Sequence, residues 1–279
     1  MLTGKKMVIF GGSGAIGGAF IDAARTHGAT CVSLGRRPPQ KRDILHIDTD
    51  IMSVVSLQQA VTTVCERIGY IDIVLNSAGT HHKPMDFVND DPSELEKEFE
   101  RVVRVNLHAA FLITLVFGKQ LIGQRNGHLI HLCSNASRLS LYGSYGYNAS
   151  KHGLEGLIKT AAAQFAPYQV RVNGVAPGTV ETSLNSHLLR QGPSNAPTPR
   201  AASILAHTPT KRFATLDGIT ETLLAICLPQ RHLTGNVVFC DDGYNIEGHS
   251  WPDGNLAVYA QSGTVDDLYK KIRDISPDD

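Results

Sequence analysis

The stretch VIFGGSGAIGGAF, residues 8–20, contains the pattern that decides the fold. An apolar run leads into a glycine-rich loop, and apolar residues then recur at helical spacing from Ala15 onward. A strand, a glycine loop and a helix N-terminus form an anion site, because backbone N–H groups and the helix dipole point at one place. The spacing Gly12-x-Gly14-x-x-Gly17 matches the dinucleotide fingerprint. We therefore expect a pyrophosphate to bind at Gly11, Ser13, Gly14, Ala15, Ile16 and Gly17.

The next strand, predicted at residues 30–34, ends in a basic turn with the sequence Gly35-Arg36-Arg37-Pro38. Enzymes that prefer NAD place an acid near this point to bind the ribose 2′-hydroxyl. Two arginines stand here instead, and guanidinium forks match a phosphate. The residues therefore favour NADP(H), held at its 2′-phosphate by Arg36 and Arg37. NAD remains the alternative if the arginines form only a solvated turn.

Strands alternate with helices along most of the chain, which predicts a parallel sheet. We expect a single-domain, Rossmann-type α/β fold over residues 1–245, with a doubly wound parallel sheet flanked by helices on both faces. Predicted strands lie near 7–10, 30–34, 44–47, 71–75, 129–133, 170–175 and 237–240, and predicted helices near 15–27, 53–68, 93–124, 147–165 and 216–228.

Two segments stand apart from this alternation. Residues 183–212 carry four prolines and little periodicity, which is typical of a substrate loop or lid. Residues 246–279 form a C-terminal extension, in which Thr264 and Asp267 read as a capping box. The apolar series that follows predicts a short helix there: Val265, Leu268, Tyr269, Ile272.

Polar and small residues follow two of the predicted buried strands. Asn76-Ser77-Ala78-Gly79 comes after strand 71–75, and Ser134 stands at the end of strand 129–133. Such positions line the crevice where α/β sheets hold ligands. Asn106 lies in the middle of the predicted long helix, where asparagine is unfavourable because its side chain competes for backbone groups. Such a residue often marks a local irregularity, and a solvent-facing asparagine is the common alternative.

The sequence YNASK, residues 147–151, places a phenol and an ammonium on one helix face, about 6 Å of rise apart. Reduction of a ketone requires a proton at oxygen, but a free phenol titrates near a pH of about 10. An ammonium about 4 Å away, at an effective dielectric of about 20, is worth about 4 kcal/mol, or roughly 3 pKa units. Lys151 would thus bring Tyr147 near neutrality, where acid–base exchange is efficient.

The composition of the 279 residues excludes several functional classes. Lys+Arg and Asp+Glu balance at 26 each, so no net field favours nucleic acid or an anionic membrane. We find no apolar run near the roughly 20 residues of a membrane helix. The five cysteines are far apart, and the twelve histidines lack metal-ligand spacing, His81–His82 included. We expect a cytoplasmic protein without a metal, in a reducing compartment.

Taken together, the motifs resemble the short-chain dehydrogenase/reductase family, shorter-chain branch, over about residues 5–245. The family's thirteen-residue interval from serine to tyrosine is met by Ser134 and Tyr147. Thr234-Gly235 and Asp241-Asp242-Gly243 resemble the family's last strand. The ordered signals are Gly11 to Gly17, Asn76-Ser77-Ala78-Gly79, Asn106, Ser134, Tyr147-x-x-x-Lys151 and Pro177-Gly178.

The resemblance implies an enzyme that interconverts a secondary alcohol and a ketone by hydride transfer with a nicotinamide cofactor. Tyr147 would be the acid/base, Lys151 the ribose ligand and modulator of the phenol, Ser134 the partner of the substrate oxygen, and Asn106 the holder of a relay water. The cofactor would also contact Asp48, Asn76, Ala78, Gly79, Pro177, Gly178, Val180 and Thr182. The resemblance also implies a homodimer or homotetramer acting on a small-molecule carbonyl or alcohol.

The chain departs from the family at three places. Phe10 replaces the usual threonine, Ala15 a loop glycine, and Asp242 a glycine after the last strand. The spacing Gly11-x-x-Gly14-x-x-Gly17 also fits the longer-chain branch. Two alternative functions therefore stay open: a nucleotide-sugar epimerase or dehydratase, and a catalytically silent dinucleotide sensor.

Overall fold

The computed structural model describes residues 2–40, 43–81, 83, 85–86, 88–140, 144–182, 185–192, 194–228 and 232–246. These residues divide into two compact units. The first consists of Met1–Pro177 and Thr215–Cys240, and the second of Gly178–Ala214 with the residues from Asp241 onward. The division falls inside the predicted domain 1–245. The helix predicted near residue 264 lies outside the described residues.

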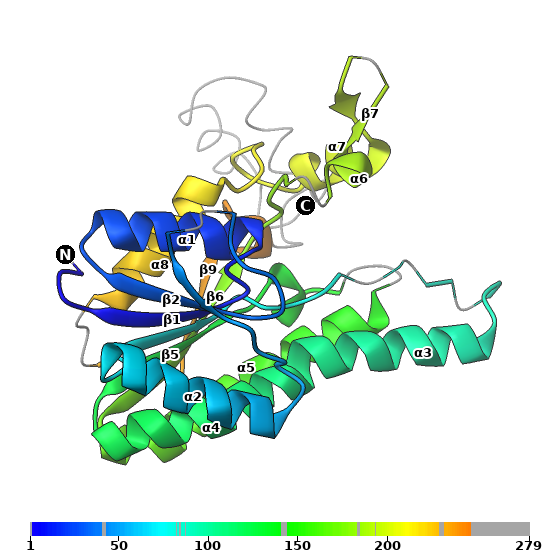
Figure 1. Cartoon of the computed structure of the whole chain (residues 1–279). Helices are drawn as coiled ribbons and strands as arrows, with labels where there is room; N and C mark the ends of the chain where they lie inside the picture. Colours follow the sequence, from blue (N-terminus) through cyan, green and yellow to red (C-terminus); the bar gives the residue numbers. More distant parts are fainter. Residues whose placement is uncertain are drawn as a thin grey trace, which may run out of the picture. The chain divides into compact units, whose positions relative to one another are not determined.

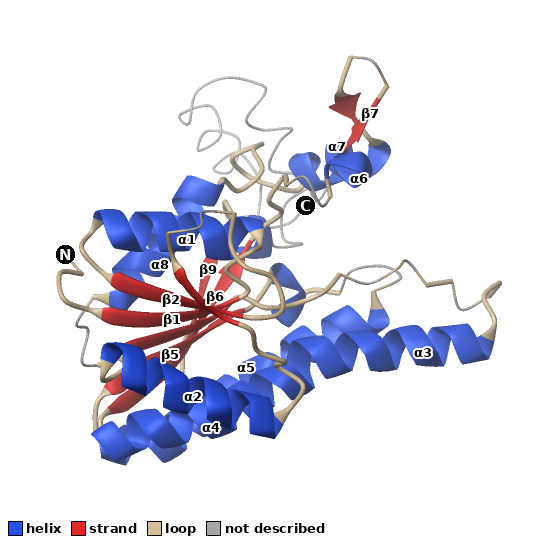
Figure 2. Cartoon of the chain, viewed as in Figure 1, coloured by secondary structure: helices blue, strands red, loops and turns tan. Residues whose placement is uncertain are grey.

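The first unit is built on a seven-stranded sheet in which every pairing is parallel (Figure 2). The strand order is β3-β2-β1-β4-β5-β6-β9. Most strand residues are buried, as expected for apolar strands covered on both faces. The parallel sheet is thus confirmed, with strands β1 Lys6–Phe10, β2 Thr30–Leu34, β3 Leu45–Ile47, β4 Ile73–Asn76, β5 Gly127–Leu132, β6 Val170–Pro177 and β9 Val237–Cys240.

Helices cover both faces of this sheet (Figure 1). Helices α1 (Ala15–Thr26) and α8 (Leu216–Cys227) lie on one face, and α2 (Val54–Ile68), α4 (Ala109–Gln124) and α5 (Tyr145–Phe165) on the other. The start of α2 is set by Ser53, whose side chain accepts a hydrogen bond from Ser56 N. Short 3-10 helices follow at Asn135–Ser137 and Ala166–Tyr168. The doubly wound arrangement is therefore confirmed.

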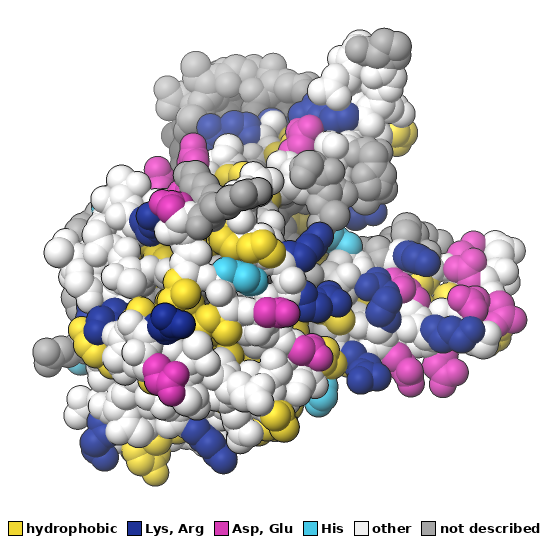
Figure 3. Space-filling model, viewed as in Figure 1, with side chains coloured by type: hydrophobic (Ala, Val, Ile, Leu, Met, Phe, Trp, Pro, Cys, Tyr) yellow, Lys and Arg dark blue, Asp and Glu magenta, His cyan; other side chains and the backbone are white. Residues whose placement is uncertain are grey.

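The long helix expected at 93–124 has three parts. Helix α3 (Pro92–Val103) passes through a π turn, η1 (Arg104–His108), into α4. The irregularity predicted at Asn106 is confirmed, because Asn106 lies inside the π turn. Acidic and basic side chains are intermixed along α3, as Figure 3 shows, and two pairs of them form ion pairs at i,i+3 spacing.

The sequence contains no unbroken apolar run of about 20 residues, but one long helix passes a test of length and mean hydropathy for a membrane span. Within the described residues, the continuous helix Pro92–Gln124 passes that test, with a mean hydropathy of 1.5 over its most apolar 18-residue window. The apolar residues of α4 pack against α2, α5 and the sheet, and 56% of that window is buried. A core helix that is covered on more than one face has the same composition.

The second unit contains more structure than the predicted loop at 183–212. Its elements are α6 Ser186–Leu189, β7 Arg190–Gln191, β8 Ala196–Pro197, α7 Pro199–Ala206 and the 3-10 helix Tyr244–Ile246, with β7 and β8 antiparallel. The side chain of Thr198 caps α7, which low periodicity does not reveal. Asp242 adopts φ 56°, in the left-handed region that glycine enters most easily, which fits the glycine that the family resemblance leads us to expect there.

Candidate active site

The strand order reverses between β1 and β4, and this switch point locates the ligand crevice. Phe10 at the end of β1 is level with Leu34 of β2 and Asn76 of β4. The segments that follow these three strands therefore leave the sheet at the same edge. They carry the glycine loop, the basic turn and the Asn76–Gly79 segment.

The glycine loop after β1 packs too closely for any side chain at two positions. Gly11 has φ 76°, and a β-carbon on it would lie 2.8 Å from Ala78 N. A β-carbon on Gly17 would lie 2.4 Å from Gly11 O. Ala15, by contrast, is exposed as the first residue of α1, so this departure from the family is tolerated.

The start of α1 fits a pyrophosphate. Gly14 is its N-cap, and no side-chain hydrogen bond caps the helix. The first N–H groups of a helix have no partner within the helix, and the helix dipole favours an anion beside them. Glycines at 11 and 14 also keep side chains away from this end of the helix. The predicted phosphate-binding loop thus has the backbone donors that a dinucleotide needs.

The basic turn after β2 is open to solvent. Arg36 and Arg37 are exposed, and neither forms an ion pair with any acid of the described residues. Gly35, with φ 145°, has no neighbour within 4 Å of a β-carbon position. Asp48, which follows β3, is also exposed. The two guanidinium groups are thus available to a phosphate.

The segment after β4 is held by two asparagines. The Asn76 side-chain oxygen accepts a hydrogen bond from Ala78 N at 3.2 Å. Buried Asn106 accepts from Thr80 N at 2.8 Å and donates to Thr80 O at 3.1 Å. A β-carbon on Gly79 would lie 3.3 Å from the Asn106 oxygen. In this structure Asn106 therefore acts as a clamp on the segment.

Of the predicted catalytic residues, Ser134 lies in the turn after β5, Tyr147 and Lys151 lie on α5, and Asn106 lies in the π turn η1. The Ser134 hydroxyl accepts a hydrogen bond from Ala136 N at 3.2 Å, as the cap of a 3-10 turn. The buried Lys151 ammonium donates to Leu132 O at 2.8 Å and lies 5.7 Å from the centroid of the Tyr147 ring. The structure therefore confirms that lysine and tyrosine share one face of α5.

Histidine 81 is a site residue that the sequence did not reveal. Its ring stacks on Tyr147, with centroids 6.0 Å apart and planes 17° apart. Arg101 of α3 donates to His81 O at 2.7 Å and to the Thr80 hydroxyl at 2.9 Å. Glu98 in turn holds Arg101 through two hydrogen bonds of 2.8 Å. This stacking depends on residues distant in sequence, so no local motif indicates it.

Burial keeps the groups beneath the site uncharged. Burial, together with the charge of Lys151, lowers the pKa of His131 on β5 to about 3. Burial likewise raises the pKa of the Cys133 thiol to about 12. The His131 ring is thus neutral, and the thiol next to Ser134 stays protonated.

The remaining predicted residues lie at or beyond the unit boundary. Pro177 ends β6, and Gly178, Val180 and Thr182 belong to the second unit. There Asn185 holds the turn, because it donates to Val180 O at 2.8 Å and accepts from Thr182 N at 2.8 Å. Glu181 forms an ion pair of 2.6 Å with Arg190.

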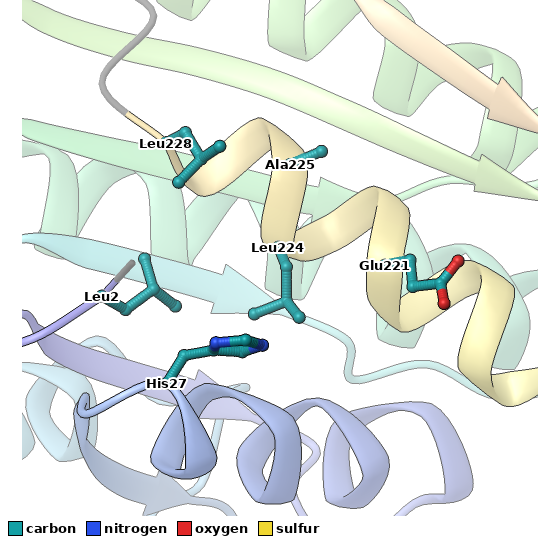
Figure 4. Close-up of a pocket in the computed structure, with 6 residues that line it drawn as sticks. All are labelled: Leu2, His27, Glu221, Leu224, Ala225 and Leu228. Carbon is teal, nitrogen blue, oxygen red and sulfur yellow. The ribbon is translucent and has the colours of Figure 1, made fainter.

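A partly open, apolar pocket of about 240 Å³ lies elsewhere, between the end of α1 and α8 (Figure 4). Leu2 and His27 face Leu224 and Leu228 across it. Since Leu2 precedes β1 and His27 follows α1, the pocket lies at the amino ends of the strands, away from the crevice. The described residues contain no cluster of His, Cys, Asp or Glu that could hold a metal ion.

Comparisons with known proteins identify the family of this chain. The family model described as short chain dehydrogenase matches residues 5–192. An uncharacterised oxidoreductase, YgcW of Escherichia coli, is 27% identical over 87% of this chain and 93% of its own. The 3-oxoacyl-acyl-carrier-protein reductase FabG of Thermotoga maritima is 28% identical over 87% of this chain and 98% of its own.

Solved structures share the fold at lower identity. A provisionally assigned D-mannonate oxidoreductase from Haemophilus influenza, solved with bound NAD, has a TM-score of 0.78 at 20% identity and covers 88% of this chain and 96% of its own. The chain belongs to the short-chain dehydrogenase/reductase family, whose members are oxidoreductases that act on CH–OH or carbonyl groups with a nicotinamide dinucleotide.

Proposed function

We propose that this chain is an NADP(H)-dependent oxidoreductase that interconverts a secondary alcohol and a ketone. The observation that best supports this proposal is the arrangement of Tyr147 and Lys151 on α5. Tyr147 is partly exposed, while the buried Lys151 ammonium, anchored on Leu132 O, lies beneath its ring. A phenol beside a fixed cation is suited to exchanging a proton with a substrate oxygen.

Each proposed catalytic residue has one task. The bound nicotinamide supplies or accepts the hydride at the substrate carbon. The Tyr147 hydroxyl gives a proton to the oxygen of a ketone, or takes one from an alcohol. Lys151 stabilises the phenolate that remains. The Ser134 hydroxyl donates a hydrogen bond to the same substrate oxygen, and Asn106, which clamps Thr80, connects the site to water.

The preference for NADP(H) rests on Arg36 and Arg37. Both are exposed and unpaired among the described residues, and each has a fork of donors that suits a 2′-phosphate. The alternative is NAD, which is bound in the Haemophilus influenza structure. Asp48, Asn76, Ala78 and Gly79 of the first unit would line the cofactor crevice. Pro177 and Gly178 would also contact the cofactor, and Val180 and Thr182 would hold the nicotinamide carboxamide.

The proposed assembly is a homodimer or homotetramer. Phe111 and Leu115 lie one turn apart on α4 and are 47% and 37% exposed. Gly156 of α5 has open space around its β-carbon position. Large exposed apolar side chains beside small residues suit a helix-to-helix interface. Light scattering on the wild type and on Leu115→Glu tests this: a monomeric wild type, or an unchanged mass for the variant, would contradict the proposal.

A cytoplasmic location is also proposed. None of the five cysteines forms a disulfide, and burial raises the pKa of Cys31, Cys133 and Cys227 to about 12. Free thiols are typical of a reducing compartment. Fractionation of cells that express the full chain would test this, and recovery in the membrane or extracellular fraction would contradict it.

The experiment that tests the function measures absorbance of the reduced cofactor at equal protein concentration. NADPH and NADH are each supplied with a panel of aliphatic ketones, cyclic ketones and sugar acids. We expect carbonyl-dependent oxidation of NADPH, with a lower KM for NADPH than for NADH. Cofactor binding without turnover on any ketone would contradict the oxidoreductase proposal, and equal KM values would contradict only the cofactor preference.

A further inference from the structure

A buried hydrogen-bonded chain connects helix α4 to the crevice through His131. The imidazole of His131 is fully buried in β5, directly beside Asn76 of β4. Its Nδ1 lies 3.2 Å from the Asn76 side-chain nitrogen, and its Nε2 lies 3.0 Å from the Thr114 hydroxyl. The Thr114 hydroxyl in turn lies 2.8 Å from Ala110 O. Every polar atom of the ring thus has one partner.

Two backbone groups at the ends of this hydrogen-bonded chain determine which of its atoms donate and which accept. Ala110 O can only accept, so the Thr114 hydroxyl donates to it and accepts from His131 Nε2. Ala78 N can only donate, so the Asn76 oxygen faces it, and the Asn76 nitrogen faces His131 Nδ1. Both ends require the same neutral ring, with its proton on Nε2.

The far end of this chain is the wall of the glycine loop. Ala78 N is the atom that a β-carbon on Gly11 would approach to 2.8 Å. Ser77, next to it, donates to Phe10 O at 2.6 Å and would meet a β-carbon on Gly17 at 2.6 Å. A change in the position of Ala78 would therefore move the surface on which the loop packs.

We propose that His131 is a positioning residue for the dinucleotide crevice. As a neutral ring with its proton on Nε2, it orients Asn76 so that the Asn76 oxygen holds Ala78 N against the glycine loop. The proposal rests on the crevice described above and on the family's nicotinamide cofactor. It does not depend on the substrate or on the choice between NADP(H) and NAD.

His128 of the same strand is a matched control. It is also buried, and its Nε2 accepts from the Asn173 side chain at 2.9 Å. Asn173 also donates to Leu233 O at 2.8 Å and accepts from Asn236 N at 3.1 Å, so this chain runs to the segment before β9. Its proton must lie on Nδ1. The two histidines thus share strand, burial and partner type but serve different ends of the sheet.

The test compares four variants by calorimetric titration with NADPH and NADH. We expect His131→Leu to raise the Kd for both cofactors about tenfold, because it leaves the Asn76 amide unpaired and free to turn. His128→Leu should lower the melting temperature and leave both Kd values unchanged. Equal changes in Kd for the two leucine variants would show a merely structural role and overturn the proposal.

Amide variants keep the test decisive if a leucine variant fails to fold. The side-chain oxygen of His131→Asn stands near the place of Nδ1 and can accept from Asn76, whereas His131→Gln reaches the place of Nε2 and only Thr114. We expect His131→Asn to keep the Kd within about twofold and His131→Gln to raise it about tenfold. The reverse order, or no difference, would contradict the proposal.

Two readouts are independent of cofactor and turnover. Nitrogen NMR of the wild type should show a proton on Nε2 of His131 and on Nδ1 of His128. Hydrogen exchange at the Ala78 amide should be faster in His131→Leu than in His128→Leu. If the wild type bound neither NADPH nor NADH, the cofactor assignment would fail. A proton on Nδ1 of His131, or unchanged exchange at Ala78, would overturn the positioning role itself.

Discussion

The loop after β1 and the turn after β2 leave the same edge of the sheet but are held in opposite ways. Gly11 and Gly17 pack against backbone atoms of their own loop and of the β4 segment. Arg36 and Arg37 extend into solvent and pair with none of the described residues. The conformation of the glycine loop is therefore fixed by packing, whereas the two arginine side chains can adapt to a bound ligand. From the proposed function we therefore expect cofactor binding and cofactor choice to reside in separate parts of the site.

We expect the largest effect from a substitution that disrupts the close packing of the glycine loop. Gly17→Ala places a methyl group 2.4 Å from Gly11 O, a backbone atom that cannot move away alone. We expect a loss of about 1–3 kcal/mol in unfolding free energy, together with loss of NADPH and NADH binding alike. Chemical denaturation and calorimetric titration measure the two effects.

The control for that variant is Gly123→Ala. Gly123 lies in α4 and has nothing within 4 Å of its β-carbon position. A methyl group there should stabilise the protein by about 0.5–1 kcal/mol and leave cofactor binding unchanged. Should Gly17→Ala behave like this control, the packing account of the loop would be wrong.

Changing the open turn should alter cofactor choice but not stability. Arg36→Ala removes charge-assisted hydrogen bonds to a 2′-phosphate, so the Kd for NADPH should rise about 10- to 100-fold. The Kd for NADH and the melting temperature should stay the same. An equal loss for both cofactors would assign Arg36 to the shared part of the dinucleotide and contradict the NADP(H) preference.

Lowering the pH should destabilise the protein by protonating His131, which lies beside the packed region. Its folded pKa of about 3 lies below its ordinary value of 6.5, so the folded state favours the neutral ring. The resulting stability is fully present above pH 6.5 and is lost as pH falls from there toward about 3, by up to about 1.4 kcal/mol per pH unit. In urea denaturation, the unfolding free energy of His131→Asn should therefore fall less between pH 6.5 and pH 4 than that of the wild type. Parallel curves for the two proteins would contradict this.

The smallest effect that we expect is the effect of salt on the affinities for the two cofactors. An exposed pair of arginines is screened by added ions, whereas backbone donors at the start of α1 carry only partial charge. Raising the ionic strength from about 0.05 to 0.5 M should weaken NADPH binding a few-fold more than NADH binding. Titrations at the two salt concentrations measure the ratio, and an unchanged ratio would indicate that no ion pair forms at the 2′ position.

The sequence predicted the parts of the molecule that local chemistry controls. The glycines at positions 11, 14 and 17, the buried strands and the Tyr147–Lys151 spacing each follow from neighbours in sequence. The irregularity at Asn106 was also predictable, because an amide competes with the helix backbone at any mid-helix position.

Other features depend on residues that only the fold brings together. His131 meets Asn76 and Thr114 across 55 and 17 positions, so no spacing rule connects them. His81 stacks on Tyr147 from a segment that Arg101 and Asn106 hold by hydrogen bonds to His81 O and Thr80 N. The short elements at 186–206 depend on caps and turns, and their apolar pattern is too brief to show a period.

The most direct test of the central claim compares the wild type with Tyr147→Phe in a single assay. Loss of one hydroxyl removes the proposed proton donor, while the ring and its packing remain. The account predicts that Tyr147→Phe binds NADPH with an unchanged Kd but loses at least about 10²-fold in kcat for ketone reduction. A variant that keeps most of the wild-type turnover would contradict the assignment of Tyr147 as the acid/base.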